Sequence, residues 1–84
     1  MQTHSPELYN RISDARPRIM RLGDAKLHLM FQNCVGYWER LDGEFVECRR
    51  LKRVTLKYTE IAQILDQALV VLEQHLVLGT LIKM

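Results

Sequence analysis

The 84-residue chain is long enough for one small domain, and its 48% hydrophobic and 26% charged residues are typical of a globular protein, which excludes a disordered class. A net charge of +2, two prolines and four glycines exclude a strongly basic, collagen-like or low-complexity chain. We therefore treat residues 1–84 as a single domain.

The first expected element is a helix over about residues 5–22. It opens on Ser5, Pro6 and Glu7, which supply a hydroxyl for the N-cap, a proline at the first helical position and an acid in the first turn. Gly23 is suited to end it, and Pro17 should kink or split it. Apolar residues recur along one face at Leu8, Ile12, Ala15, Ile19 and Leu22.

The middle element, about residues 24–58, allows two interpretations. In the first, the segments KLHLMF and RVTLKYT alternate like strands, and Asp42-Gly43 forms a hairpin turn. In the second, the segment is one long helix with Asp24 as its N-cap and a heptad seam. The seam positions are Leu27, Phe31, Cys34, Trp38, Leu41, Phe45 and Cys48.

We favour the helical interpretation of the middle element. The strand alternation fails between Asn33 and Leu41, whereas the heptad holds until Lys52. Gly36 and Gly43 each cost roughly 1 kcal/mol inside a helix, so a break near Gly43 stays open.

The last element is expected to be a helix over about residues 59–78. Thr59 is suited to cap it, Glu60 lies in its first turn, and Gly79 is suited to end it. Residues 61–82 are mostly apolar but are interrupted by charged residues, so no membrane span is expected.

These elements predict an all-α fold, a small helical bundle with a long middle helix and an apolar C-terminal helix. The alternative is an α+β fold, an antiparallel meander flanked by the N- and C-terminal helices.

The apolar stripe of the last helix is too wide to face a single neighbour, so we expect a homodimer whose two chains share one core. Acidic residues 39–47 of one chain should then face basic residues of the other. The expected interface residues are Leu65, Leu69, Val70, Leu72, Leu76 and Val77.

A basic run directly follows the acidic residues and is a candidate site for nucleic acid or another anionic partner. It consists of Arg49, Arg50, Lys52, Arg53 and Lys57. On one helix, Arg49, Arg53 and Lys57 would align and repel, which an anionic partner would relieve. A helix-turn-helix is not expected, because no turn signal lies near Asp66 and residues 67–76 hold no arginine or lysine.

No pattern for catalysis was found. The chain has no CxxC, no HxxxH and no Gly-rich phosphate loop, so no metal, cofactor or catalytic residue is predicted. Cys34 and Cys48 are expected to be buried, reduced thiols, since one helix would hold them roughly 21 Å apart. The N-terminus lacks a signal-peptide pattern, which predicts a cytoplasmic location.

The sequence thus favours a non-enzymatic interaction module: a small adaptor, inhibitor or regulatory subunit that acts as a homodimer and binds a second protein through a helical face. The alternative is a small dimeric nucleic-acid-binding transcriptional regulator that uses the basic run.

Overall fold

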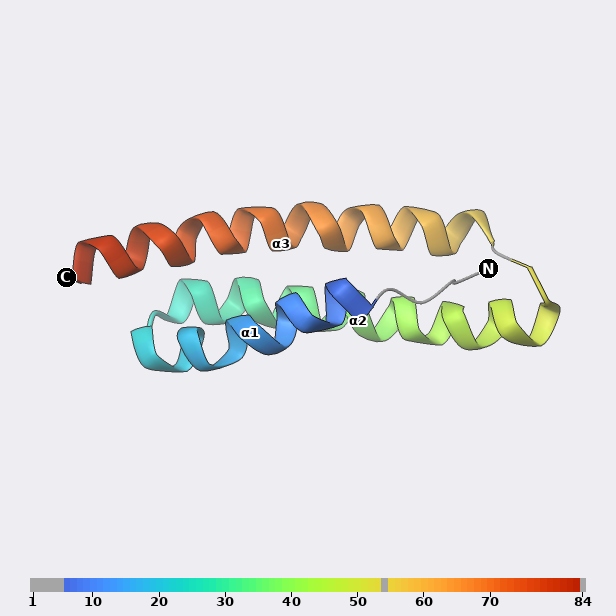
Figure 1. Cartoon of the computed structure of the whole chain (residues 1–84), viewed down its shortest axis with the longest axis horizontal. Helices are drawn as coiled ribbons and strands as arrows, with labels where there is room; N and C mark the ends of the chain where they lie inside the picture. The colour runs from blue at the N-terminus through green and yellow to red at the C-terminus, as the bar shows by residue number, and fades with distance from the viewer. Residues whose placement is uncertain (1–5, 54, 84) are drawn as a thin grey trace.

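The computed structural model is a bundle of three helices, α1 (Pro6–Leu22), α2 (Ala25–Leu51) and α3 (Leu56–Lys83) (Figure 1). It describes residues 6–53 and 55–83, with side chains described as far as Leu78. Within these ranges no residue is in a strand. The predicted all-α bundle with a long middle helix and an apolar C-terminal helix is confirmed, and the α+β alternative is wrong.

Helices α2 and α3 form a long antiparallel hairpin, and α1 lies along only part of it, away from the α2–α3 turn (Figure 1). The lengths explain this arrangement, because α1 has 17 residues whereas α2 and α3 have 27 and 28. Helix α1 runs in the same direction as α3. The molecule is therefore elongated, with principal extents of 49 × 19 × 17 Å.

Helix α1 is continuous through Pro17, which was expected to kink or split it. Pro17 is exposed, so the hydrogen bond that it removes lies on the solvent side of the helix. Gly23 ends the helix as expected, with a φ of +64° and an N–H group that donates to the Ile19 carbonyl at 3.1 Å. Ser5, the expected N-cap, lies outside the described residues.

Helix α2 begins at the predicted cap. The Asp24 carboxylate accepts hydrogen bonds from the backbone N–H groups of Lys26 at 2.9 Å and Leu27 at 3.3 Å. The helix shows no break at Gly43. The heptad seam is confirmed, since five of its members are buried and two are partly buried against the core: Leu27, Phe31, Cys34, Leu41 and Cys48, then Trp38 and Phe45.

The end of α2 and the start of α3 differ from the expected bounds. Helix α2 stops at Leu51 because Lys52 adopts a left-handed conformation with φ of +57°, so the helix does not extend over the whole of the predicted middle element. The predicted cap at Thr59 is wrong. Thr55 caps α3 instead, because its Oγ1 accepts the N–H of Tyr58 at 3.1 Å. At the other end, α3 continues past Gly79, the predicted stop, to Lys83.

The core is built around one row of α3 that we call the leucine seam. Its four residues have 0% exposure, and they pack against the buried faces of α1 and α2. Tyr58 and Ile61 extend the row towards the α2–α3 turn. The members of the leucine seam are Leu65, Leu69, Leu72 and Leu76.

The seam predicts where α3 is sensitive to truncation. Leu69→Ala should lower the free energy of unfolding by about 2–5 kcal/mol, because it leaves a cavity among three helices. Leu29→Ala is the matched control: Leu29 is 63% exposed on α2, and its loss should change stability by less than about 0.5 kcal/mol. Urea unfolding followed by circular dichroism measures both, and equal losses would contradict this packing.

Candidate functional site

The side of α3 opposite the leucine seam carries a second apolar surface, which we call the outer face. Its large apolar side chains are between 36% and 56% exposed, although they lie in the middle of a packed helix. A helix that is buried on one side and apolar on the other has more apolar surface than one bundle can cover. The outer face consists of Ile64, Gln67, Val70, Val71, Gln74, Val77 and Leu78.

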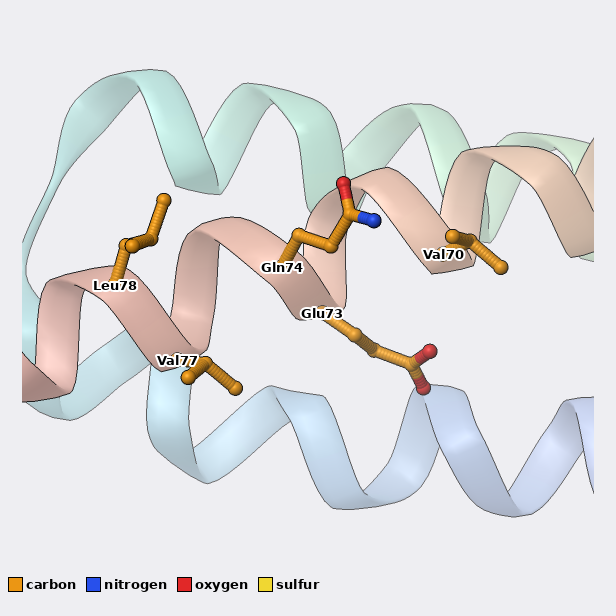
Figure 2. A pocket seen from close by; sticks show the side chains of 5 residues that line it. All are labelled: Val70, Glu73, Gln74, Val77 and Leu78. Carbon is orange, nitrogen blue, oxygen red and sulfur yellow. The ribbon is translucent and has the colours of Figure 1, made fainter.

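A shallow open hollow lies on the C-terminal half of this face (Figure 2). Gln74 stands near its middle, Val70 lies one turn before it, and Val77 and Leu78 lie one turn after it. Glu73 lines the edge of the hollow and points towards α1. The hollow is therefore bordered mostly by aliphatic groups, with a single amide at its centre and one carboxylate at its rim.

The carboxylate at the rim belongs to an ion-pair cluster between α1 and α3. The Arg11 guanidinium donates two hydrogen bonds to Glu73, from Nε at 2.9 Å and from Nη2 at 2.7 Å, and a third from Nη1 to Asp66 at 2.6 Å. The hydrogen bonds to Glu73 are the main reason that the pKa of Arg11 is raised above its usual value. The cluster fixes α1 beside α3 and offsets much of the acidic charge at the border of the outer face.

The expected dimer interface divides between the two sides of α3. Its four leucines form the leucine seam and are fully covered by α1 and α2 of the same chain. They have no exposed surface for a second chain in this fold. A core shared by two chains stays a prediction. Val70 and Val77 are 36% and 52% exposed and belong to the outer face.

The basic run does not form a row on one helix. Arg49 and Arg50 occupy the last turn of α2, Lys52 and Arg53 lie in the connection, and Lys57 lies in the first turn of α3. The expected alignment of Arg49, Arg53 and Lys57 is wrong because the helix ends at Leu51. All five side chains are exposed around one end of the hairpin.

Acidic groups of the same chain contact two of these cations. Arg50 Nη2 lies 2.9 Å from Glu47, and Lys57 Nζ lies 3.5 Å from Glu44. The Thr55 hydroxyl also donates to Glu44 at 3.4 Å. Part of the acidic segment is therefore paired within its own chain, where pairing with a second chain was expected.

An aromatic pair marks the start of α1. The rings of Tyr9 and Trp38 lie 5.5 Å apart between centroids at 49°, which joins α1 to α2. Together with Pro6 and Asp42 they line a second open hollow. Tyr9 is 51% exposed, so part of this aromatic surface remains accessible to solvent.

The two thiols lie in the core and are not joined by a disulfide, as expected. Burial raises the pKa of Cys34 above its usual value, and the nearby Glu73 charge acts in the same direction. His75 Nδ1 lies 2.9 Å from the carbonyl oxygen of Val71, one turn earlier in α3. Among the described residues no group of three or more His, Cys, Asp or Glu side chains could hold a metal ion.

By length and composition alone, the Leu56–Leu78 part of α3 could cross a membrane. The core helix of a water-exposed bundle meets the same criterion, and here the leucine seam is covered by α1 and α2. No protein-family model, no curated protein and no solved structure matches the chain.

Sequence reasoning missed part of the outer face and the whole Arg11 cluster. Ile64, Val71 and Leu78 recur every seven residues, and this spacing was the available signal for a second apolar row. The pairing of Arg11 with Asp66 and Glu73 had no local signal, because it joins residues 55 and 62 positions apart.

The ion-pair cluster predicts an unequal response to two arginine substitutions. Arg11→Leu should destabilise the protein by about 1–2 kcal/mol, because Asp66 and Glu73 lose three charge-assisted hydrogen bonds. The loss should shrink in 1 M salt, which screens the remaining acids.

Arg50→Leu is the control, since Arg50 and Glu47 form an exposed pair worth less than about 0.5 kcal/mol. Urea unfolding of both variants at two salt concentrations measures the difference. An Arg11 effect no larger than the Arg50 effect would show that the cluster does not hold α1.

Proposed function

We propose that this chain is a non-enzymatic protein-interaction module that forms a homodimer through the outer face of α3. The observation that carries the proposal is the row of exposed aliphatic side chains directly opposite the buried leucine seam. Monomeric proteins rarely expose a contiguous apolar patch of this kind, and a two-fold dimer is the commonest way to cover one. Its large apolar members are Ile64, Val70, Val71, Val77 and Leu78.

The charge distribution favours a second copy as the occupant. The outer face itself carries no charged side chain, and Asp66 and Glu73, which lie on its α1 side, are held by Arg11. The exposed Glu60 lies one turn before Ile64, just beyond the end of the face. A neutral apolar surface does not repel its own copy, and it offers little to a strongly charged partner.

Under this proposal α3 is a helix of the bundle and not a membrane span. Asp66 and Glu73 lie within its apolar stretch and bind Arg11 of α1, an arrangement that would be costly in hydrocarbon. The dimer would leave the outward sides of α1 and α2 open to a second protein, which suits an adaptor, inhibitor or regulatory subunit that uses no cofactor.

The double substitution V70E/V77E tests the proposal. The wild type should sediment as a dimer at micromolar concentration, about twice the chain mass of 9.9 kDa, and the variant as a monomer. Two carboxylates on each outer face would be desolvated and mutually repelled in the dimer. Because each chain has its own leucine seam, the variant should keep its helical circular dichroism.

The control is L29E/V46E, which places two carboxylates at exposed aliphatic positions of α2, 63% and 59% exposed. It should remain a dimer. A wild-type monomer at micromolar concentration would contradict the proposal. Binding of the wild type, but not of V70E/V77E, to lipid vesicles would assign the outer face to a membrane surface instead.

A second candidate function is nucleic acid binding by the basic run. It is favoured by the way the α2–α3 connection gathers exposed cations at one end of the bundle, and weakened by the pairing of Arg50 and Lys57 with glutamates. If it is correct, the protein should shift random duplex DNA in low salt, and affinity should fall steeply with added salt. R49A/K52A/R53A should then abolish the shift. Absence of any shift by the wild type in low salt removes this candidate.

A further inference from the structure

Building on the proposed homodimer, we propose that the two copies pack with their α3 helices antiparallel about a two-fold axis that passes between Val70 and Val71. The axis is perpendicular to α3 and relates the outer face of one chain to the same face of the other. Two features of the chain, one on α3 and one on α1, place the axis at the same level.

The first feature is the order of residues in the part of the outer face from Ile64 to Val77, which reads the same way in both directions. Leu78, the remaining member, would face the partner's Gln63. From residue 64 to residue 77 the types are Ile, Gln, Val, Val, Gln and Val, at spacings of three, three, one, three and three. An axis between Val70 and Val71 sets like against like. Ile64 lies beside the partner's Val77, and Gln67 lies beside the partner's Gln74, where two amides can exchange hydrogen bonds.

The second feature is a row of alternating charges on α1. The proposed axis lies in the plane of the interface and is perpendicular to α3. It reverses the direction of the partner's α3 but leaves the partner's α1 on the same edge of the interface. The α1 helices of the two chains therefore lie along one edge. The row includes Arg11, whose contacts with Asp66 and Glu73 show that it borders α3. Its members fall on one side of the helix at spacings of four, three and four: Glu7, Arg11, Asp14 and Arg18.

In the antiparallel dimer, the charged row of one α1 lies beside the same row of the partner's α1 in reverse order, and this places opposite charges next to each other. Glu7 faces the partner's Arg18, and Asp14 faces the partner's Arg11. A parallel dimer would instead place the two α1 rows on opposite edges, where neither could pair with the other. The charges therefore favour the antiparallel arrangement.

The two features agree on the position of the axis. Arg11 lies between Asp66 and Glu73, so it is level with about residue 69 or 70 of α3. Helices α1 and α3 run in the same direction and rise equally per residue. The centre of the charged row, between Ile12 and Ser13, is therefore level with about residue 71, beside the axis given by the outer face.

Cysteine cross-linking tests this register. The proteins are Q67C and Q74C, alone and mixed in equal amounts, under mild oxidation. In the proposed register the mixture should form a disulfide-linked dimer, because residue 67 faces the partner's residue 74. Each variant alone should not, since its two cysteines lie about 10 Å apart along the helices, beyond the usual Cα separation of roughly 4.4–6.8 Å. Native Cys34 and Cys48 are buried, so they should not take part in cross-linking. The control is N33C, which places a cysteine at an exposed position of α2.

Every other outcome of the cross-linking overturns the inference. Self-linking of both variants would show a parallel dimer, and self-linking of Q74C alone would move the axis to residue 74. A protein that sediments as a dimer but gives no cross-link in any sample would place the interface elsewhere. In each case the sedimentation of V70E/V77E still decides the proposed function separately.

Charge reversal supplies a second readout. R18E and E7R should each weaken the dimer several-fold, and the combination E7R/R18E should restore most of the affinity. Circular dichroism of each variant checks that α1 is intact. A combined variant that dimerises more weakly than both single variants would overturn the α1 pairing and, with it, the antiparallel arrangement.

Discussion

The fold depends on the burial of the leucine seam of α3. Four leucines with no exposed surface require apolar neighbours on two sides, and the heptad seam of α2 supplies only one of them. Helix α1 supplies the other through its own apolar row. Because α1 is shorter than the hairpin, it covers only part of the seam's length, and the bundle narrows to two helices near the α2–α3 turn (Figure 1).

Polar groups at the edges of α1 determine its position more closely than apolar burial alone would. Arg11 fixes one edge to α3 through Asp66 and Glu73, while Arg16 lies 5.1 Å above the ring of Phe31 and holds the other edge to α2. Apolar packing has little directional preference, whereas a guanidinium fork accepts few geometries. These contacts therefore set the level of α1 along the hairpin, and with it the place of its charges beside the outer face.

The two sides of α3 serve different purposes under the proposed function. The inner side is satisfied within one chain, so each copy can fold by itself. The outer side is mostly apolar but is not covered by any described part of its own chain. It also carries the amides of Gln67 and Gln74, whereas the inner side carries the leucine seam. An interface that includes the amides of Gln67 and Gln74 would bind less tightly than a leucine core, but unsatisfied amides would penalise a shifted register. This combination suits reversible assembly of a folded module.

The sequence by itself determined the helices, because their signals are local: the Asp24 cap, the Gly23 stop and the heptad of α2 all depend on residues a few positions apart. The sequence-based prediction misplaced the α2–α3 connection for two reasons. Thr55 and Thr59 are equally suitable cap residues, and the left-handed turn at Lys52 contains no glycine that would have indicated it. Which side of α3 faces inward was not decided locally either, because both sides are apolar. Only the tertiary structure decided it: α1 and α2 together cover the four leucines, and Arg11 reaches acids more than fifty residues away. That choice left Val70 and Val77 exposed and moved the candidate interface to the opposite side of the helix.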